Sequence, residues 1–280
     1  MDPEVAGSSP VGRPNFQLIF MSWIESALFG ILQGLTEFFP VSSSAHLKLF
    51  KIFFEKEAEG HHVLVDLVGH LGTLFAVLIF FRKEIRTLVT TDRKNLRFLL
   101  LATLPLIPCY LMLKPLRDLM SAPECLGFCL MATSGILFLG QKWRPRSPFA
   151  HSSNRFLKEA LMIGTLQSAA LIPGISRSAS TISCARVLGW DAKDAVRFSF
   201  LLSIPTVIGG NCVELAKIYF MGESPPPVSI ETCLIAFISA GLAGLFAIRF
   251  AMNILEKGHL KPFAWYCLGL GALTALYLNR

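Results

Sequence analysis

Apolar residues in this chain fall in blocks that are long enough to cross a lipid bilayer. The blocks are about 16–24 residues long, and short charged loops separate them. Hydrophobic residues make up 53% of the 280 residues and charged residues only 16%, against about 25% charged in a typical soluble protein. Because the blocks fill almost the whole chain, no sizeable soluble domain remains. The sequence therefore predicts an all-α polytopic membrane protein.

The loops between the blocks predict how the chain is oriented. Six transmembrane helices are expected, at residues 63–81, 98–113, 125–141, 198–220, 230–250 and 262–279. Most Lys and Arg lie in loops 82–97, 142–158 and 249–261, which the positive-inside rule places in the cytoplasm. The net charge of +7 thus belongs to membrane-flanking loops, and without interleaved aromatic residues it does not indicate nucleic-acid binding.

Two further stretches are apolar but contain a polar turn. They lie before residue 63 and between residues 158 and 197, and Pro40 and Pro173-Gly174 interrupt them. All charged loops keep a consistent side only if each stretch enters and leaves the membrane on the same side. We therefore predict two re-entrant helix pairs, the first entering from outside and the second from the cytoplasm. Protein or a wet cavity must cover such irregular backbone.

A comparison of the chain with itself indicates an internal repeat. At an offset of 134 the identical pairs are Glu25 and Glu159, Gly30 and Gly164, Leu32-Gln33 and Leu166-Gln167, Ser42 and Ser176, Ser44 and Ser178, and Ala45 and Ala179. Repeat one covers about residues 16–141 and repeat two about 158–280, in a single membrane domain over 16–280. Residues 1–15 are interpreted as a disordered tail. Three spans per copy make the repeat inverted, and inverted repeats place polar sites at their interface.

The first polar turn carries a carboxylate, three hydroxyls and an imidazole. Gln33 and Glu37 are four residues apart and share a helix face, and an intramembrane carboxylate is expected to be functional. The serines Ser42, Ser43 and Ser44 could cap the following helix, whose free N–H groups favour anions. His46 could act as base, acid or ligand. The turn is therefore suited to a phosphate.

The second turn has the composition of an oxyanion clamp. Arg177 offers a planar fork for phosphate oxygens, and Ser176, Ser178 and Thr181 add hydroxyls. Two alternatives stay open: Arg177 could form a structural ion pair with Glu37, and hydroxyls such as Ser180 could only pack helices together.

A second polar pair accompanies the two turns. Asp66 and His70 share a face of span 63–81, where a supporting polar network is expected rather than direct catalysis.

These motifs resemble the bacterial undecaprenyl-diphosphate phosphatases of the bacitracin-resistance type. Gln33 to Glu37 is similar to that family's (E/Q)xxxE motif, and Pro173 to Thr181 matches its PGxSRSxxT motif at every fixed position. His46 falls at the family's histidine, whereas Ala45 and Ala179 stand where the family usually has Gly. The resemblance covers almost the whole chain.

The resemblance implies an inner-membrane enzyme that hydrolyses undecaprenyl diphosphate to undecaprenyl phosphate and phosphate, with its site open to the outside. It implies a divalent cation, Mg²⁺ or Ca²⁺, for which Glu37 and Gln33 are the candidate ligands. Glu37, Ser43, His46 and Arg177 are the expected catalytic residues, and Ser42, Ser44, Ser176, Ser178 and Thr181 are expected to bind substrate.

The sequence leaves two questions of function open. The nucleophile is either Ser43 activated by His46, or a water molecule that His46 and Glu37 orient. A lipid-phosphate transporter or flippase of the same architecture is the alternative function, because broken helices in inverted repeats are typical of transporters.

Overall fold

The computed structural model describes residues 22–54, 63–142, 153–220 and 228–280, and these residues form helices and connecting turns without a strand. The first half contains α1 Trp23–Phe38, α2 Ser43–Phe53, α3 Val63–Phe80, α4 Arg82–Thr90, α5 Arg93–Thr103, α6 Leu106–Met112, α7 Lys114–Met120 and α8 Leu126–Lys142. The second half contains α9 Ser153–Gln167, α10 Arg177–Val187, α11 Ala192–Phe220, α12 Ile230–Leu255 and α13 Lys261–Leu278. Short 3₁₀ turns lie at Pro123–Cys125 and Ser168–Leu171. The predicted disordered tail lies outside the described residues.

Five helical segments are long and apolar enough to cross a membrane. They are Val63–Phe80, Arg93–Met112, Pro123–Lys142, Ala192–Phe220 and Ile230–Leu255, which correspond to five of the six predicted spans. The sixth predicted span forms α13, an 18-residue helix that is not among these five. The described chain is therefore an all-helical, multi-pass membrane protein, as the apolar blocks predicted.

Two of these spans differ in detail from the sequence prediction. The span expected at 98–113 consists of two helices, because Pro105 ends α5 and begins α6 and a proline removes a helix hydrogen bond. The span expected at 198–220 begins earlier, at Ala192. The Asp191 side chain accepts a hydrogen bond from the Asp194 N–H at 2.8 Å, and this contact extends the helix start beyond the apolar block.

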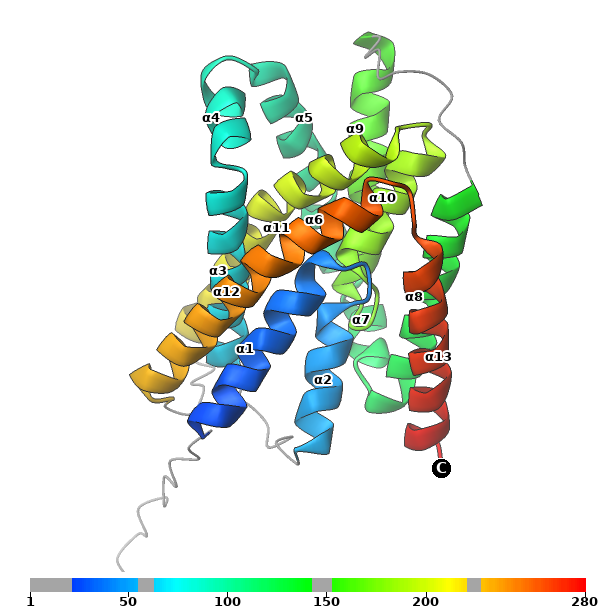
Figure 1. Ribbon diagram of the computed structural model, residues 1–280. Helices are drawn as coiled ribbons and strands as arrows, with labels where there is room; N and C mark the ends of the chain where they lie inside the picture. The colour runs from blue at the N-terminus through cyan, green and yellow to red at the C-terminus, as the bar shows by residue number, and fades with distance from the viewer. Residues whose placement is uncertain (1–21, 55–62, 143–152, 221–227) are drawn as a thin grey trace, which may run out of the picture.

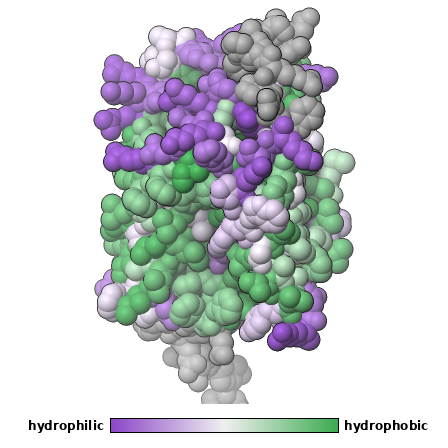
Figure 2. All heavy atoms as spheres, turned by 45° about the vertical axis from the view of Figure 1, so that its right-hand side comes forward, coloured by the Kyte–Doolittle hydropathy of each residue, from purple (hydrophilic) through white to green (hydrophobic). Residues whose placement is uncertain are grey.

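Polar and apolar surfaces are separated along the molecule. The basic segments α4 and α5 lie at one end, and the C-terminus lies at the other (Figure 1). Figure 2 shows hydrophilic side chains gathered over the first end, above a broad belt of hydrophobic side chains. Exposed apolar side chains such as Phe75, Leu242 and Phe246 are expected on a surface that contacts lipid acyl chains.

Two helix pairs stop inside the molecule instead of crossing it. α1 and α2 lie in the half of the molecule that carries the C-terminus, and α9 and α10 lie towards the opposite end (Figure 1). α2 and α10 each have 11 residues, and their bounds are separated by the 134-residue offset of the sequence match. This arrangement agrees with the two predicted re-entrant pairs, and it brings their turns together in the interior.

Close packing of α1 on α12 fixes the first pair in place. A Cβ atom added to Gly34 would lie 2.5 Å from the Ala240 carbonyl oxygen, and one added to Gly30 would lie 1.9 Å from Ser239 Oγ. Small residues allow helices in membranes to approach this closely. The position of the first turn, which begins where α1 ends, therefore depends on backbone contact with α12.

Candidate functional site

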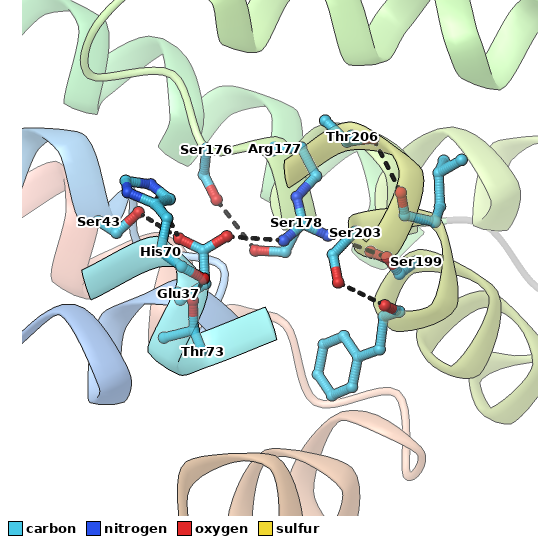
Figure 3. A network of polar contacts seen from close by, with 12 residues as sticks. Glu37, Ser43, His70, Thr73, Ser176, Arg177, Ser178, Ser199, Ser203 and Thr206 are labelled. Carbon is cyan, nitrogen blue, oxygen red and sulfur yellow. Dashed lines mark hydrogen bonds and ion pairs between the residues drawn. The ribbon is translucent and has the colours of Figure 1, made fainter. Parts of the chain in front are cut away.

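The two predicted turns meet directly. The Gly174 N–H donates to Ser44 Oγ at 3.2 Å, and Ser178 Oγ donates to the Phe39 carbonyl oxygen at 3.2 Å. These hydrogen bonds join residues 130 and 139 positions apart in the chain. Side chains of the two turns form one polar network (Figure 3), as the repeat predicted.

A serine caps the helix that follows each turn. Ser42 accepts from the Ala45 N–H at 3.4 Å, and Ser176 accepts from the Ala179 N–H at 3.2 Å. This is the capping role that the sequence suggested for the serine run. The methyl groups of Ala45 and Ala179 are fully buried in the protein core, so the helices accommodate the two alanines that replace the family's usual glycines.

Both turns contain a residue with left-handed backbone. Ser42 has φ 70° and Gly174 has φ 97°. A Cβ on Gly174 would also lie 2.6 Å from Cys129 Cβ, so glycine suits this position both conformationally and sterically. Ser42 adopts a conformation that costs a non-glycine residue free energy, and such strain concentrates at functional sites.

Glu37, at the end of α1, is the centre of the network. Its Oε1 pairs with Arg177 Nη2 at 2.9 Å, and its Oε2 accepts from Ser43 Oγ at 2.8 Å and from Gln33 Nε2 at 3.2 Å. The side chain is only 9% exposed. Its carboxylate is therefore positioned to accept the proton of the Ser43 hydroxyl, and Arg177 compensates its negative charge.

Arg177 is held on two sides but keeps free donors. Nη2 donates to Glu37, and Nη1 donates to the Ser199 carbonyl oxygen in α11 at 2.9 Å. A guanidinium group has five N–H donors, so further donors remain for an anion. The ion pair that the sequence offered as an alternative is present, and it leaves the clamp function possible.

A cavity of about 790 Å³ adjoins this network. Its wall is mostly apolar and includes residues of α3, α6, α7 and α11. The predicted site residues Glu37, Ser42, Ser43, Ser44, Ser176, Arg177 and Ser178 all line it. The combination of a polar network and an apolar chamber is suited to a ligand with a charged head and a hydrocarbon tail.

The cavity wall does not include three of the predicted residues, Gln33, His46 and Thr181. His46 stacks on Tyr266 of α13, with its Nε2 2.7 Å from the Tyr266 hydroxyl and its Nδ1 2.7 Å from the Ser42 carbonyl oxygen. Since a carbonyl only accepts, Nδ1 carries the proton and Nε2 accepts from the tyrosine. Both nitrogens are thus engaged away from Ser43. Thr181 Oγ1 donates to the Arg177 carbonyl oxygen at 3.0 Å and lies 2.6 Å from Ser199 Oγ.

Two residues of the site, Gln167 and Ser199, carried no local sequence signal, whereas His70 was expected from its pairing with Asp66. His70 lines the cavity, and its Nε2 lies 3.9 Å from Glu37 Oε2, consistent with the supporting role expected for it. Gln167 also lines the cavity, and its buried Nε2 has no hydrogen-bond partner in the described part of the chain. Ser199 fixes Arg177 through its backbone. The repeat was the one signal that singled out Gln167, as the counterpart of Gln33.

The network contains few ligands for a metal ion. Within the described residues, no three His, Cys, Asp or Glu side chains are grouped as a metal site. Gln33 Oε1 is buried without a hydrogen-bond partner in these same residues, beside the Glu37 carboxylate. Reversing the amide would place two oxygens together. Such a pair fits Mg²⁺, which proteins often bind through one or two carboxylates with the remaining ligands from phosphates and water.

Comparisons with known proteins identify the family of this chain. The model of the family "Bacitracin resistance protein BacA" matches residues 26–273. An undecaprenyl-diphosphatase of Protochlamydia amoebophila is 39% identical over 91% of this chain and 98% of its own length. One of Halothermothrix orenii is 36% identical over 93% and 97%, and undecaprenyl-diphosphatase 4 of Bacillus thuringiensis subsp. konkukian is 33% identical over 90% and 96%. The chain belongs to the bacitracin resistance protein BacA family.

Proposed function

We propose that this protein is a membrane phosphatase that hydrolyses undecaprenyl diphosphate to undecaprenyl phosphate and inorganic phosphate. The observation that carries the proposal is the Ser43–Glu37–Arg177 contact at the polar end of an apolar cavity. It combines an activated hydroxyl, a proton acceptor and a phosphate clamp. The names of the curated relatives support the same activity and substrate.

In the proposed reaction, Ser43 Oγ attacks the terminal phosphorus and gives its proton to Glu37 Oε2, 2.8 Å away. The bond from this phosphorus to the bridging oxygen breaks, and undecaprenyl phosphate leaves with the electron pair. Water then attacks the phosphoserine, and Glu37 returns its proton to the departing Ser43 oxygen. Both protons of the water stay with the released phosphate, and Glu37 is again a carboxylate. Arg177 neutralises the charge on the transferred phosphoryl group.

Glu37 is preferred to His46 as the proton acceptor, because His46 is engaged with Tyr266 and Ser42. Gln33 and Glu37 would hold Mg²⁺ or Ca²⁺, and the cation would neutralise charge on the diphosphate. The serines Ser42, Ser44, Ser176 and Ser178 surround this end of the cavity and supply further hydroxyls for the phosphate oxygens.

The proposed setting is the bacterial inner membrane, with the first helix pair open to the periplasm. The basic helices α4 and α5 would face the cytoplasm, and the end that carries the C-terminus would face outward. Hydrolysis there would renew the lipid carrier for peptidoglycan synthesis. It would also give the bacitracin resistance for which the family is named.

Phosphate release by the purified protein in detergent tests this proposal. Micelles have no two sides, so turnover there supports an enzyme, and binding without turnover supports a transporter or flippase. Ser43→Ala should abolish release. Ser229→Ala removes the serine that caps α12 outside the cavity, and it should retain wild-type turnover. Equal turnover in both variants would contradict the proposed site.

A further inference from the structure

A second group of positively charged and polar side chains lines the same cavity, far from Arg177. Arg117 of α7 lies with its guanidinium carbon 4.2 Å from the centre of the Tyr110 ring. Lys217 of α11 lies with Nζ 5.8 Å from the same ring centre. Asn211 is 8% exposed, and its Nδ2 has no hydrogen-bond partner among the described residues. All four residues line the cavity.

This group is a separate site, because distance excludes a shared diphosphate. Arg177 donates a hydrogen bond to the Ser199 carbonyl oxygen of α11. Lys217 lies eighteen positions after Ser199 in the same helix. At 1.5 Å per residue the helix spans about 27 Å between the two positions, whereas the two phosphorus atoms of a diphosphate are adjacent. Figure 1 shows α7 in the half of the molecule that carries the C-terminus, so the group lies towards that end of the cavity.

The chemistry of the group selects an anion. Arg117, Lys217, the Asn211 amide nitrogen and the Tyr110 hydroxyl are all hydrogen-bond donors. Glu214 offsets one charge, because Lys217 Nζ pairs with its Oε1 at 2.6 Å. Arg117 forms no ion pair with a carboxylate of the described residues. Arg117 therefore adds one uncompensated positive charge to this end of the cavity.

We propose that Arg117, Lys217, Tyr110 and Asn211 form a second phosphate-binding site at the outward end of the cavity. It binds a phosphate group in transit: either the headgroup of the lipid substrate before it reaches Arg177, or the inorganic phosphate after release. The choice of phosphate as ligand rests on the proposed function. The described lining of the cavity is mostly apolar and contains no Lys or Arg besides Arg117, Arg177 and Lys217. Positive charge at the outward end therefore lowers the barrier to transfer of a phosphate group.

Kinetics of the double variant Arg117→Gln/Lys217→Gln in detergent test the second site and identify the source of the phosphate. A rise of about tenfold in KM for undecaprenyl diphosphate, the size expected for loss of a charge-assisted hydrogen bond, identifies the arriving headgroup. A similar rise confined to the inhibition constant of inorganic phosphate identifies the leaving product. Lys114→Gln removes a charge from the same helix outside the cavity and should change neither. If neither constant changes in the double variant, or if Lys114→Gln changes them equally, the second site is wrong.

A binding measurement separates failure of this site from failure of the proposed function. Arg177→Ala removes the catalytic clamp but leaves the second group intact. Equilibrium dialysis with radiolabelled inorganic phosphate should still detect saturable binding to this variant, and adding Arg117→Gln/Lys217→Gln should abolish that binding. If Arg177→Ala binds phosphate in this way but the wild-type protein hydrolyses no undecaprenyl diphosphate, the phosphatase is refuted and the second site is retained. Absence of binding in folded Arg177→Ala would refute the site alone, and size-exclusion chromatography establishes that each variant is folded.

Discussion

Replacement of Arg177 by lysine tests how the clamp works, because it keeps the charge and removes the planar fork. Arg177 uses two nitrogens at once, one on Glu37 and one on the Ser199 carbonyl oxygen, both at 2.9 Å. A lysine ammonium on its flexible stem cannot hold both partners and also bind a phosphate oxygen in the same geometry. Arg177→Lys should therefore lose at least one charge-assisted contact in the transition state.

The size of the expected effect follows from the burial of the pair. The Arg177 and Glu37 side chains are 13% and 9% exposed, so solvent screens their interaction little. One charge-assisted hydrogen bond is worth about 1.5–3 kcal/mol, which corresponds to a loss of about 10- to 150-fold in kcat/KM. Arg177→Ala should lose more, because it also leaves the Glu37 charge unpaired in a buried site.

The assay is release of inorganic phosphate from undecaprenyl diphosphate by protein purified in detergent. Arg197→Lys is the matched control, since Arg197 pairs with Glu256 at 3.1 Å and does not line the cavity. Its kcat/KM should stay within about twofold of wild type, as expected for a more exposed ion pair. Wild-type kcat/KM in Arg177→Lys, or an equal loss in Arg197→Lys, would refute the clamp.

Three further predictions concern the carboxylate, the second turn and the cation. Glu37→Gln removes the proton acceptor and should lower kcat by about 10²- to 10⁴-fold in the phosphate-release assay. Gly174→Ala forces a side chain into a φ of 97° with its Cβ 2.6 Å from Cys129 Cβ, and it should lower the thermal unfolding midpoint measured by intrinsic fluorescence. Removing divalent cations with EDTA should abolish phosphate release, and Mg²⁺ in excess should restore it.

Each of these predictions has its own control. Glu231→Gln removes an exposed carboxylate at the start of α12 and should leave kcat unchanged. Gly209→Ala adds a Cβ that meets nothing within 4 Å, so its unfolding midpoint should not fall. An unchanged kcat in Glu37→Gln, equal midpoints for the two glycine variants, or full activity in EDTA would contradict the corresponding argument.

The membrane architecture was predictable because crossing a bilayer depends on the length and hydropathy of a segment. Those quantities are local. The charged loops add a predicted orientation, with the basic loops in the cytoplasm, and this orientation stays a prediction. The points at which helices begin and end inside the apolar blocks were harder to predict. Pro105 lies inside an apolar block, and whether a proline bends a helix or ends it depends on the packing around it. The early start of α11 depends on the Asp191 cap, which hydropathy does not detect.

The site was predictable to the extent that its residues lie within the two turns. The repeat indicated that the turns carrying Glu37 and Arg177 form one site. In the structure Arg177 Nη2 lies 2.9 Å from Glu37 Oε1. The surroundings of His46 could not be foreseen, because its partner Tyr266 is 220 residues away and belongs to no motif. For the same reason no local pattern indicated that Ser199 would hold Arg177 from α11. Contacts of this kind arise only from the packing of distant helices.

The covalent state of Ser43 during turnover tests the central claim most directly. Purified protein would be mixed with undecaprenyl diphosphate, quenched in acid within one turnover, digested and analysed by mass spectrometry. The account predicts a phosphoryl group on Ser43 in the wild-type protein, a higher yield of it when water attack is slowed, and no turnover in Ser43→Ala. Phosphate release that continues in Ser43→Ala, with no phosphoserine at this position in the wild type, would contradict the account.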